Sequence, residues 1–218
     1  GACTIGPFAR LRPGTVLAHC VWLDDGEVEL LAATGTCVAH CPTSNMKLAS
    51  GTAAIDRLRA AGVRFGLGSD GGISNNSLSM LECMKIASLL QKVTGLDATA
   101  LPAREAIELA TIRGAAVLGV EDVIGSLEVG KAADLVTLHL WQPHLLPIAD
   151  SEGHDPVLWN LVFAARASDV RDVWVDAEPV VAGGRSLRID ETATLEAVHA
   201  QTRSLLARRA RVDGVSVR

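Results

Sequence analysis

Three ionisable side chains stand at the ends of three successive strand-like stretches. His19 follows "GTVLA", His40 follows "TCVA", and Asp70 follows "VRFGLG". A strand interior disfavours aspartate, and a turn could equally use Asn or Ser, so Asp70 is either a turn former or a reacting group. One histidine behind a strand is more often a structural residue, but an ionisable group behind each of three strands favours a shared site.

These residue types suit metal chemistry better than the alternatives. Imidazole and carboxylate groups are ligands of zinc and other divalent metals, and both also transfer protons. The sequence has no G-x-S-x-G turn to present a nucleophilic serine and no Walker A loop to hold nucleotide phosphates. The pattern therefore predicts metal-assisted hydrolysis.

Strand-like and helical patterns alternate through the first half of the chain. The strands are expected at 14–18, 36–39 and 63–68, and the helices at 24–34, 52–62, 78–93 and 102–119. Start and stop signals support the helices: Asp24, a capping box from Ser79 to Glu82, Pro102, Gly35, Gly62 and Gly119. This order indicates a parallel α/β fold. Because the carboxyl ends of parallel strands meet at one edge, we expect the three ionisable groups within about 10 Å of a common point.

The composition excludes several classes of protein. With 218 residues, a net charge of -5 and a pI near 5.7, the chain gives no reason to expect nucleic acid or an anionic membrane as partner. No apolar run approaches the ~18 residues of a membrane helix, and the first residues do not resemble a signal peptide. Five cysteines without a C-x-x-C pair predict buried thiols in a reduced, cytoplasmic protein, rather than a zinc site at Cys37, His40 and Cys41.

Four motifs then carry a family resemblance. They are "LAHCVWL", "VAHCPTSNMKLASG", "GLGSDGGISNNSLSMLECMKIASLLQK" and "IGSLEVGKAADLV". Together, over about residues 13 to 190, they resemble the amidohydrolase superfamily. Within the superfamily, they resemble the branch that contains 5-methylthioadenosine/S-adenosylhomocysteine deaminases, chlorohydrolases and guanine-type deaminases. Asn75 and Asn76, with the "ASLLQK" helix, lean toward the adenosine-derivative deaminases.

The resemblance implies an α/β fold in which a (β/α)8 barrel of the TIM type is joined to a small β-sandwich. Residues 14–122 would form the C-terminal part of the barrel, about strands six to eight, and residues 123–190 part of the sandwich. Residues 191–218 would be a C-terminal helix and tail. The resemblance also implies one divalent metal, with zinc favoured over iron or manganese, and a small heterocyclic substrate.

The resemblance assigns roles residue by residue. Asp70 corresponds to an aspartate that ligates the metal and accepts a proton from the attacking water. His19 corresponds to a histidine that polarises that water or the tetrahedral intermediate. His40 would support the site or contact the substrate. The residues expected to shape the pocket are Trp22, Asn45, Lys47, Ser50, Gly51 and Asn76.

Part of the family's ligand set is missing. The family binds its metal through an HxH pair and a further histidine, and the other histidines here form no such pair. Three barrel strands would also leave an open sheet edge, through which copies could associate. The sequence therefore predicts a deaminase or related hydrolase, acting on a purine-like or triazine-like ring and present as a C-terminal portion. The alternative is a non-catalytic fragment or chimeric product.

The two ends of the chain carry weaker signals. Residues 2–14 resemble a hexapeptide-repeat segment of bifunctional N-acetylglucosamine-1-phosphate uridylyltransferase/acetyltransferases, which indicates either chance or a fusion junction near Arg12. We therefore treat residues 1–13 as a segment of uncertain origin. Residues 124–140 and 169–187 predict β structure, with a hairpin from Asp176 to Pro179 and a turn at Gly183 and Gly184. Residues 191–211 predict an amphipathic helix.

Overall fold

A parallel sheet of three strands forms the first half of the protein. The computed structural model describes residues 11–148 and 155–213. Its first sheet contains β1 (Val16–Ala18), β2 (Cys37–His40) and β3 (Phe65–Leu67) in the order β1-β2-β3, with Val16 opposite Cys37 and Val38 opposite Phe65. The prediction of three parallel strands in sequence order is confirmed, although each strand is shorter or shifted by a residue.

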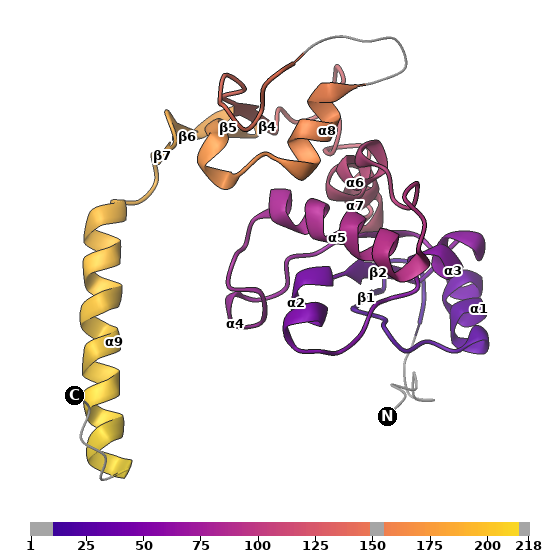
Figure 1. Ribbon diagram of the computed structural model, residues 1–218, viewed down its shortest axis with the longest axis horizontal. Helices are drawn as coiled ribbons and strands as arrows, with labels where there is room; N and C mark the ends of the chain where they lie inside the picture. Colours follow the sequence, from indigo (N-terminus) through magenta and orange to yellow (C-terminus); the bar gives the residue numbers. More distant parts are fainter. Residues whose placement is uncertain (1–10, 149–154, 214–218) are drawn as a thin grey trace.

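Helices connect these strands. α1 (Asp25–Thr34) joins β1 to β2, and α2 (Pro42–Lys47) and α3 (Ile55–Ala60) join β2 to β3 (Figure 1). Asp24 caps α1 through the Glu27 amide, with the Glu27 side chain returning to the Asp24 amide, and Gly35 ends it in the left-handed conformation. Both signals were predicted. α2 was not, because six residues beginning with Pro42 show no helical periodicity.

Four helices follow β3: α4 (Gly72–Asn75), α5 (Met80–Gly95), α6 (Ala103–Ala110) and α7 (Ile112–Leu118). Ser79 caps α5 through the Glu82 amide, which is one half of the predicted capping box; the Ser79 amide donates to the Ser77 hydroxyl instead. The prediction of one helix over 102–119 is wrong, because Thr111 leaves the helical region with φ -128° and ψ -105°. The break is accompanied by close packing of α7 on β3: a Cβ on Gly66 would stand 2.9 Å from the Gly114 Cα.

The main core joins the parallel sheet to its helices. Its largest fully buried members are Leu31 of α1, Val38 of β2, Ile55 and Leu58 of α3, Leu101 just before α6, and Leu109 of α6. A second cluster packs Val162 of α8 (Pro156–Phe163) against Met84, Ala103 and Ala106. The carboxyl ends of the three strands therefore sit on a well-packed base.

A four-stranded antiparallel sheet lies in the second half of the chain. Its strands are β4 (Leu135–Leu138), β5 (Val170–Val175), β6 (Glu178–Ala182) and β7 (Arg185–Ser186), with the short 3-10 helix η1 (Ala167–Asp169) before β5. The β prediction for 124–140 holds only from Leu135, because the preceding residues turn at Gly125 and Gly130 with φ of 95° and 99°. The predicted hairpin is present, with Asp176 and Ala177 at φ 50° and 63°.

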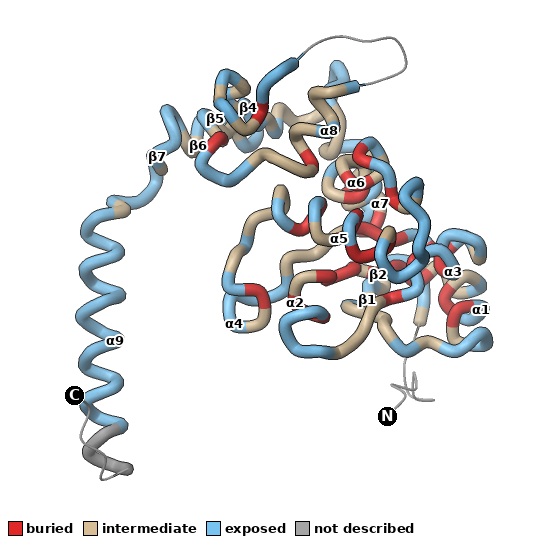
Figure 2. Tube along the Cα trace, in the orientation of Figure 1, coloured by how far each residue is buried: buried red, intermediate tan, exposed pale blue. Residues whose placement is uncertain are grey.

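Helix α9 (Glu191–Asp213) follows the antiparallel sheet and stands apart from the rest of the protein (Figure 1). The prediction of a helix here is confirmed, but residues 192–209 are all exposed, so this stretch of α9 buries no apolar face (Figure 2). No helix among the described residues is long and apolar enough to cross a membrane. The proposed hexapeptide-repeat segment falls largely on residues 1–10, which lie outside the described residues.

Candidate functional site

The carboxyl ends of β1, β2 and β3 bring the three predicted groups to one edge of the sheet. The His19 amide donates to the Ala39 carbonyl at 2.9 Å, and the Gly68 amide donates to the His40 carbonyl at 2.8 Å, so the strand alignment continues past the last paired residues. The His19 Nε2 atom lies 3.8 Å from the Asp70 Oδ2 atom. The sequence predicts that the side chains at these strand ends lie close together, and His19 and Asp70 do so.

The Asp70 carboxylate is held by three donors. The Ser44 and Ser74 hydroxyls donate to Oδ2 at 2.6 Å and 2.7 Å, and the Gly71 amide donates to Oδ1 at 2.7 Å. These hydrogen bonds, the one from Ser44 first, lower the pKa of Asp70 to about 2. Asp70 is therefore ionised at neutral pH and can act as a ligand or as a proton acceptor.

Asn45 orients the His19 ring. Its side-chain Oδ1 lies 2.8 Å from the His19 Nδ1 atom. Because an amide oxygen can only accept, Nδ1 is the donor in this bond, and Nε2 is the nitrogen turned toward Asp70. Asn45 is buried, and its Nδ2 atom has no hydrogen-bond partner among the described residues. The amide thus fixes the imidazole from a position inside the protein.

His40 lies on the neighbouring strand but is fully buried. Neither ring nitrogen has a hydrogen-bond partner among the described residues. Burial, with a smaller contribution from His19, lowers the pKa of His40 to about 4, so the ring is neutral at pH 7. Buried polar atoms are rarely left unpaired, so the two ring nitrogens of His40 are an exception among the described residues.

The other predicted pocket residues lie around the end of α2 and the 48–51 loop that follows it. The Trp22 Nε1 atom donates to the Ser50 carbonyl at 2.7 Å, and a Cβ on Gly51 would stand 2.9 Å from the Trp22 ring. Lys47 bridges the Ile73 carbonyl and the Asn76 side chain. Trp22 and Asn76 therefore brace the loop, and no hydrogen bond joins either of them to His19 or Asp70 among the described residues.

Sequence reasoning missed the two serine donors. Ser74 stands four residues after Asp70, a spacing at which a helix-start side chain can return to the preceding turn, so a signal was available for it. Ser44 offers no such signal, because it reaches Asp70 from α2, 26 positions away in sequence. Behind these groups, burial raises the pKa of the Cys41 and Cys83 thiols, which keeps them protonated.

The donor set is incomplete for a metal ion. No group of three His, Cys, Asp or Glu side chains that could hold a metal occurs in the part of the chain that the structure describes. A catalytic zinc site needs about three protein ligands and a water molecule. Asp70 and the adjacent His19 could supply part of such a ligand set. The described residues do not supply the rest of it.

The sequence profile described as the amidohydrolase family matches residues 6–182, so the chain belongs to the amidohydrolase family. The chain is 49% identical over 195 residues to a 5-methylthioadenosine/S-adenosylhomocysteine deaminase of Desulforudis audaxviator, a match that covers 89% of this chain and 44% of that relative. It is 42% identical over 196 residues to a 5'-deoxyadenosine deaminase of Methanosarcina mazei, covering 90% and 44%.

The structural comparison agrees. A crystal structure of an adenosine deaminase from Xanthomonas campestris with bound zinc matches with a TM-score of 0.81 and 38% identity, covering 90% of this chain and 43% of that one. The chain thus spans less than half the length of the relatives that it matches. The family resemblance predicted from the sequence is confirmed, and these relatives carry deaminase names.

Proposed function

We propose that this chain provides the C-terminal part of a metal-dependent amidohydrolase that removes the amino group from the purine ring of an adenosine derivative. The observation that carries the proposal is the His19–Asp70 pair at the carboxyl edge of the parallel sheet, 3.8 Å apart. Asn45 and Ser44 fix this pair from inside the protein. The deaminase names of the relatives support the substrate class.

The proposal places β1, β2 and β3 as strands six to eight of a (β/α)8 barrel. Their parallel order and the helices between them support this assignment. β1 is an edge strand whose Val16 and Ala18 are exposed, as expected of a strand that pairs with a neighbour in a complete barrel. The antiparallel sheet β4–β7 would be part of the β-sandwich.

In hydrolytic deamination a water oxygen adds to the ring carbon that carries the amino group, and ammonia leaves. Asp70 is ionised, accepts the proton that this water gives up and passes it to the departing amino group, which leaves as ammonia. The His19 Nε2 atom, turned into the site by Asn45, accepts a hydrogen bond from the adding water and so orients and polarises it. A bound zinc ion would supply a Lewis acid and acidify the water. Ser44 and Ser74 keep the carboxylate in place.

The second candidate is a non-catalytic fragment or a chimeric product. It is favoured by the incomplete donor set, because the described residues hold no group of three metal-binding side chains. The two candidates differ in what happens when the missing ligands are supplied. The deaminase proposal requires activity and zinc binding to appear together, whereas a non-catalytic fragment would gain neither.

A chimera provides the test. The matched segment of the Desulforudis audaxviator relative is replaced by this chain, and ammonia release is measured with 5-methylthioadenosine, 5'-deoxyadenosine and a triazine. We expect release from the adenosine derivatives. His19→Asn should lower turnover about 10²-fold while zinc stays bound. Glu121→Gln, an acidic residue outside the site, is the matched control. A folded, zinc-loaded chimera without activity on any adenosine derivative would refute the proposal.

A further inference from the structure

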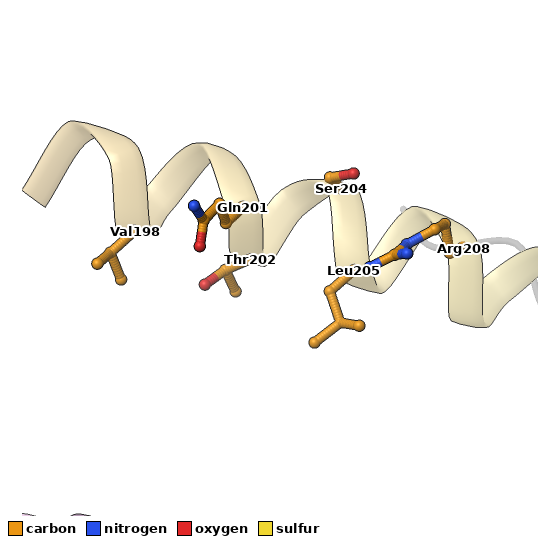
Figure 3. Close-up of a pocket in the computed structure, with 6 residues that line it drawn as sticks. All are labelled: Val198, Gln201, Thr202, Ser204, Leu205 and Arg208. Carbon is orange, nitrogen blue, oxygen red and sulfur yellow. The ribbon is translucent and has the colours of Figure 1, made fainter.

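Helix α9 carries an apolar stripe that nothing in the described structure covers. Leu195, Val198 and Leu205 are 70%, 55% and 58% exposed, and Leu206 lies beside them. Figure 3 shows Val198, Thr202 and Leu205 along one side of the helix, with Ser204 on the opposite side. Positions 195, 198, 202 and 205 have the 3-4 spacing of a helix that packs against another helix.

The hollow on this helix is not a ligand site. It has a volume of about 370 Å³, and every residue that lines it comes from α9: Val198, Gln201, Thr202, Ser204, Leu205 and Arg208. A hollow whose walls all belong to one helix has no facing side, so it cannot enclose a small molecule. What it lacks is an opposite surface of similar shape.

The charges on α9 indicate what that surface is. Glu191 and Glu196 lie toward its N-terminal end, just after Asp190, and Arg203, Arg208 and Arg209 lie toward its C-terminal end. Glu191 and Arg209 are 18 positions apart, which is about five helical turns, so they project in the same direction at the two ends of the stripe. The stripe thus begins with a negative group and ends with a positive one.

We propose that α9 pairs in antiparallel orientation with α9 of a second copy of this chain. A two-fold axis near residue 200 places Leu195 against Leu205 and Val198 against Thr202, each contact occurring twice. The same axis places Glu191 of one copy against Arg209 of the other at both ends. A parallel pair would instead bring like charges together, and antiparallel helices also align their dipoles favourably.

The pairing accounts for the position of α9. A helix in a protein gains most of its stability by packing an apolar face against another element. The described part of this chain provides no such surface for α9. The proposal is independent of the catalytic assignment, because no residue of α9 belongs to the candidate site. It also differs from association through the edge of the parallel sheet, which would not depend on α9.

The test is analytical ultracentrifugation of the full chain over a wide range of concentration. We expect a monomer–dimer equilibrium, and Leu205→Glu should abolish it. Glu191→Arg and Arg209→Glu should each weaken self-association about tenfold, because each creates like-charge pairs at both ends. An equimolar mixture of these two variants should restore dimerisation, because every end pair is then opposite in charge. Glu196→Arg, which projects away from the stripe, is the control.

The mixture removes the main ambiguity. Glu191 also accepts a hydrogen bond from the Ser186 amide at 2.9 Å, so Glu191→Arg alone could act by loosening the start of the helix. That loss persists in the mixture, whereas the charge repulsion does not. Circular dichroism checks that helix content is kept. A monomer at all concentrations, association that survives Leu205→Glu, or a mixture no tighter than its components would overturn the proposal.

Discussion

The parallel and antiparallel sheets differ sharply in burial. In β2 and β3, Cys37, Val38, His40 and Phe65 are buried, whereas no residue of β4, β5, β6 or β7 is (Figure 2). Helices α1, α3 and α6 contribute buried side chains to the core that contains β2 and β3. A sheet needs a covered face to be stable, so the first region can hold its own geometry while the second depends on a cover from elsewhere.

This difference matters for the site. His19 and Asp70 extend from the region that has a packed base, and their positions are set by contacts within this chain. The antiparallel sheet contributes no residue to the site as described. We therefore expect the geometry of the site to survive changes in the last third of the chain and to fail with changes in the core.

A matched pair of substitutions to alanine, one in each region, tests the comparison and should give the largest effect. Ile55→Ala removes a fully buried side chain and should cost about 2–5 kcal/mol of the free energy of unfolding. Val136→Ala, at a position that is 56% exposed in β4, should cost less than about 0.5 kcal/mol. Urea denaturation followed by circular dichroism measures both. Equal costs would show that the antiparallel sheet is packed as well as the parallel one.

Acid should act on the parallel region through His40. Its pKa is lowered from 6.5 to about 4, so between these values the unfolded chain binds a proton that the folded chain does not. The contribution of neutral His40 to the free energy of unfolding is therefore fully present above pH 6.5. It is lost as the pH drops toward 4, by about 3 kcal/mol in total. His40→Leu should flatten this slope in urea denaturation at a series of pH values. An unchanged slope would mean that other groups cause it.

A substitution in the hairpin between β5 and β6 should have a smaller effect and should stabilise the protein, in contrast to Ile55→Ala. Ala177 has a φ of 63°, where a Cβ is strained and glycine is not. Ala177→Gly should therefore raise the melting temperature, by an amount that corresponds to about 1 kcal/mol. Ala182→Gly, within β6, should lower it. If Ala177→Gly also destabilises, the turn is not strained and the comparison loses its local explanation.

Much of the parallel region could be predicted from the sequence because its signals are local. Asp24, Gly35 and Gly119 mark helix ends through contacts a few residues away, and the strands are short apolar runs. Asp70 was identified because a carboxylate is out of place behind a strand. The break at Thr111 was missed, since it depends on packing of α7 against β3, which no local pattern records.

The partners within the site were harder to predict. Asn45 was expected to shape the pocket, but its hydrogen bond to His19 joins residues 26 positions apart. Ser44 reaches Asp70 across the same interval. The burial of His40 also depends on how neighbouring elements pack around it. These contacts arise from tertiary structure, and residue spacing alone does not encode them.

The central claim is that Asp70 holds the metal and accepts the proton in the completed enzyme. Its most direct test is Asp70→Asn in the chimera with the Desulforudis audaxviator relative, with zinc measured by atomic absorption and turnover by ammonia release from 5'-deoxyadenosine. We expect zinc content to fall and turnover to drop about 10³-fold or more, because the variant loses both a ligand and a base. Full zinc content with unchanged turnover in the Asp70→Asn chimera would contradict the claim.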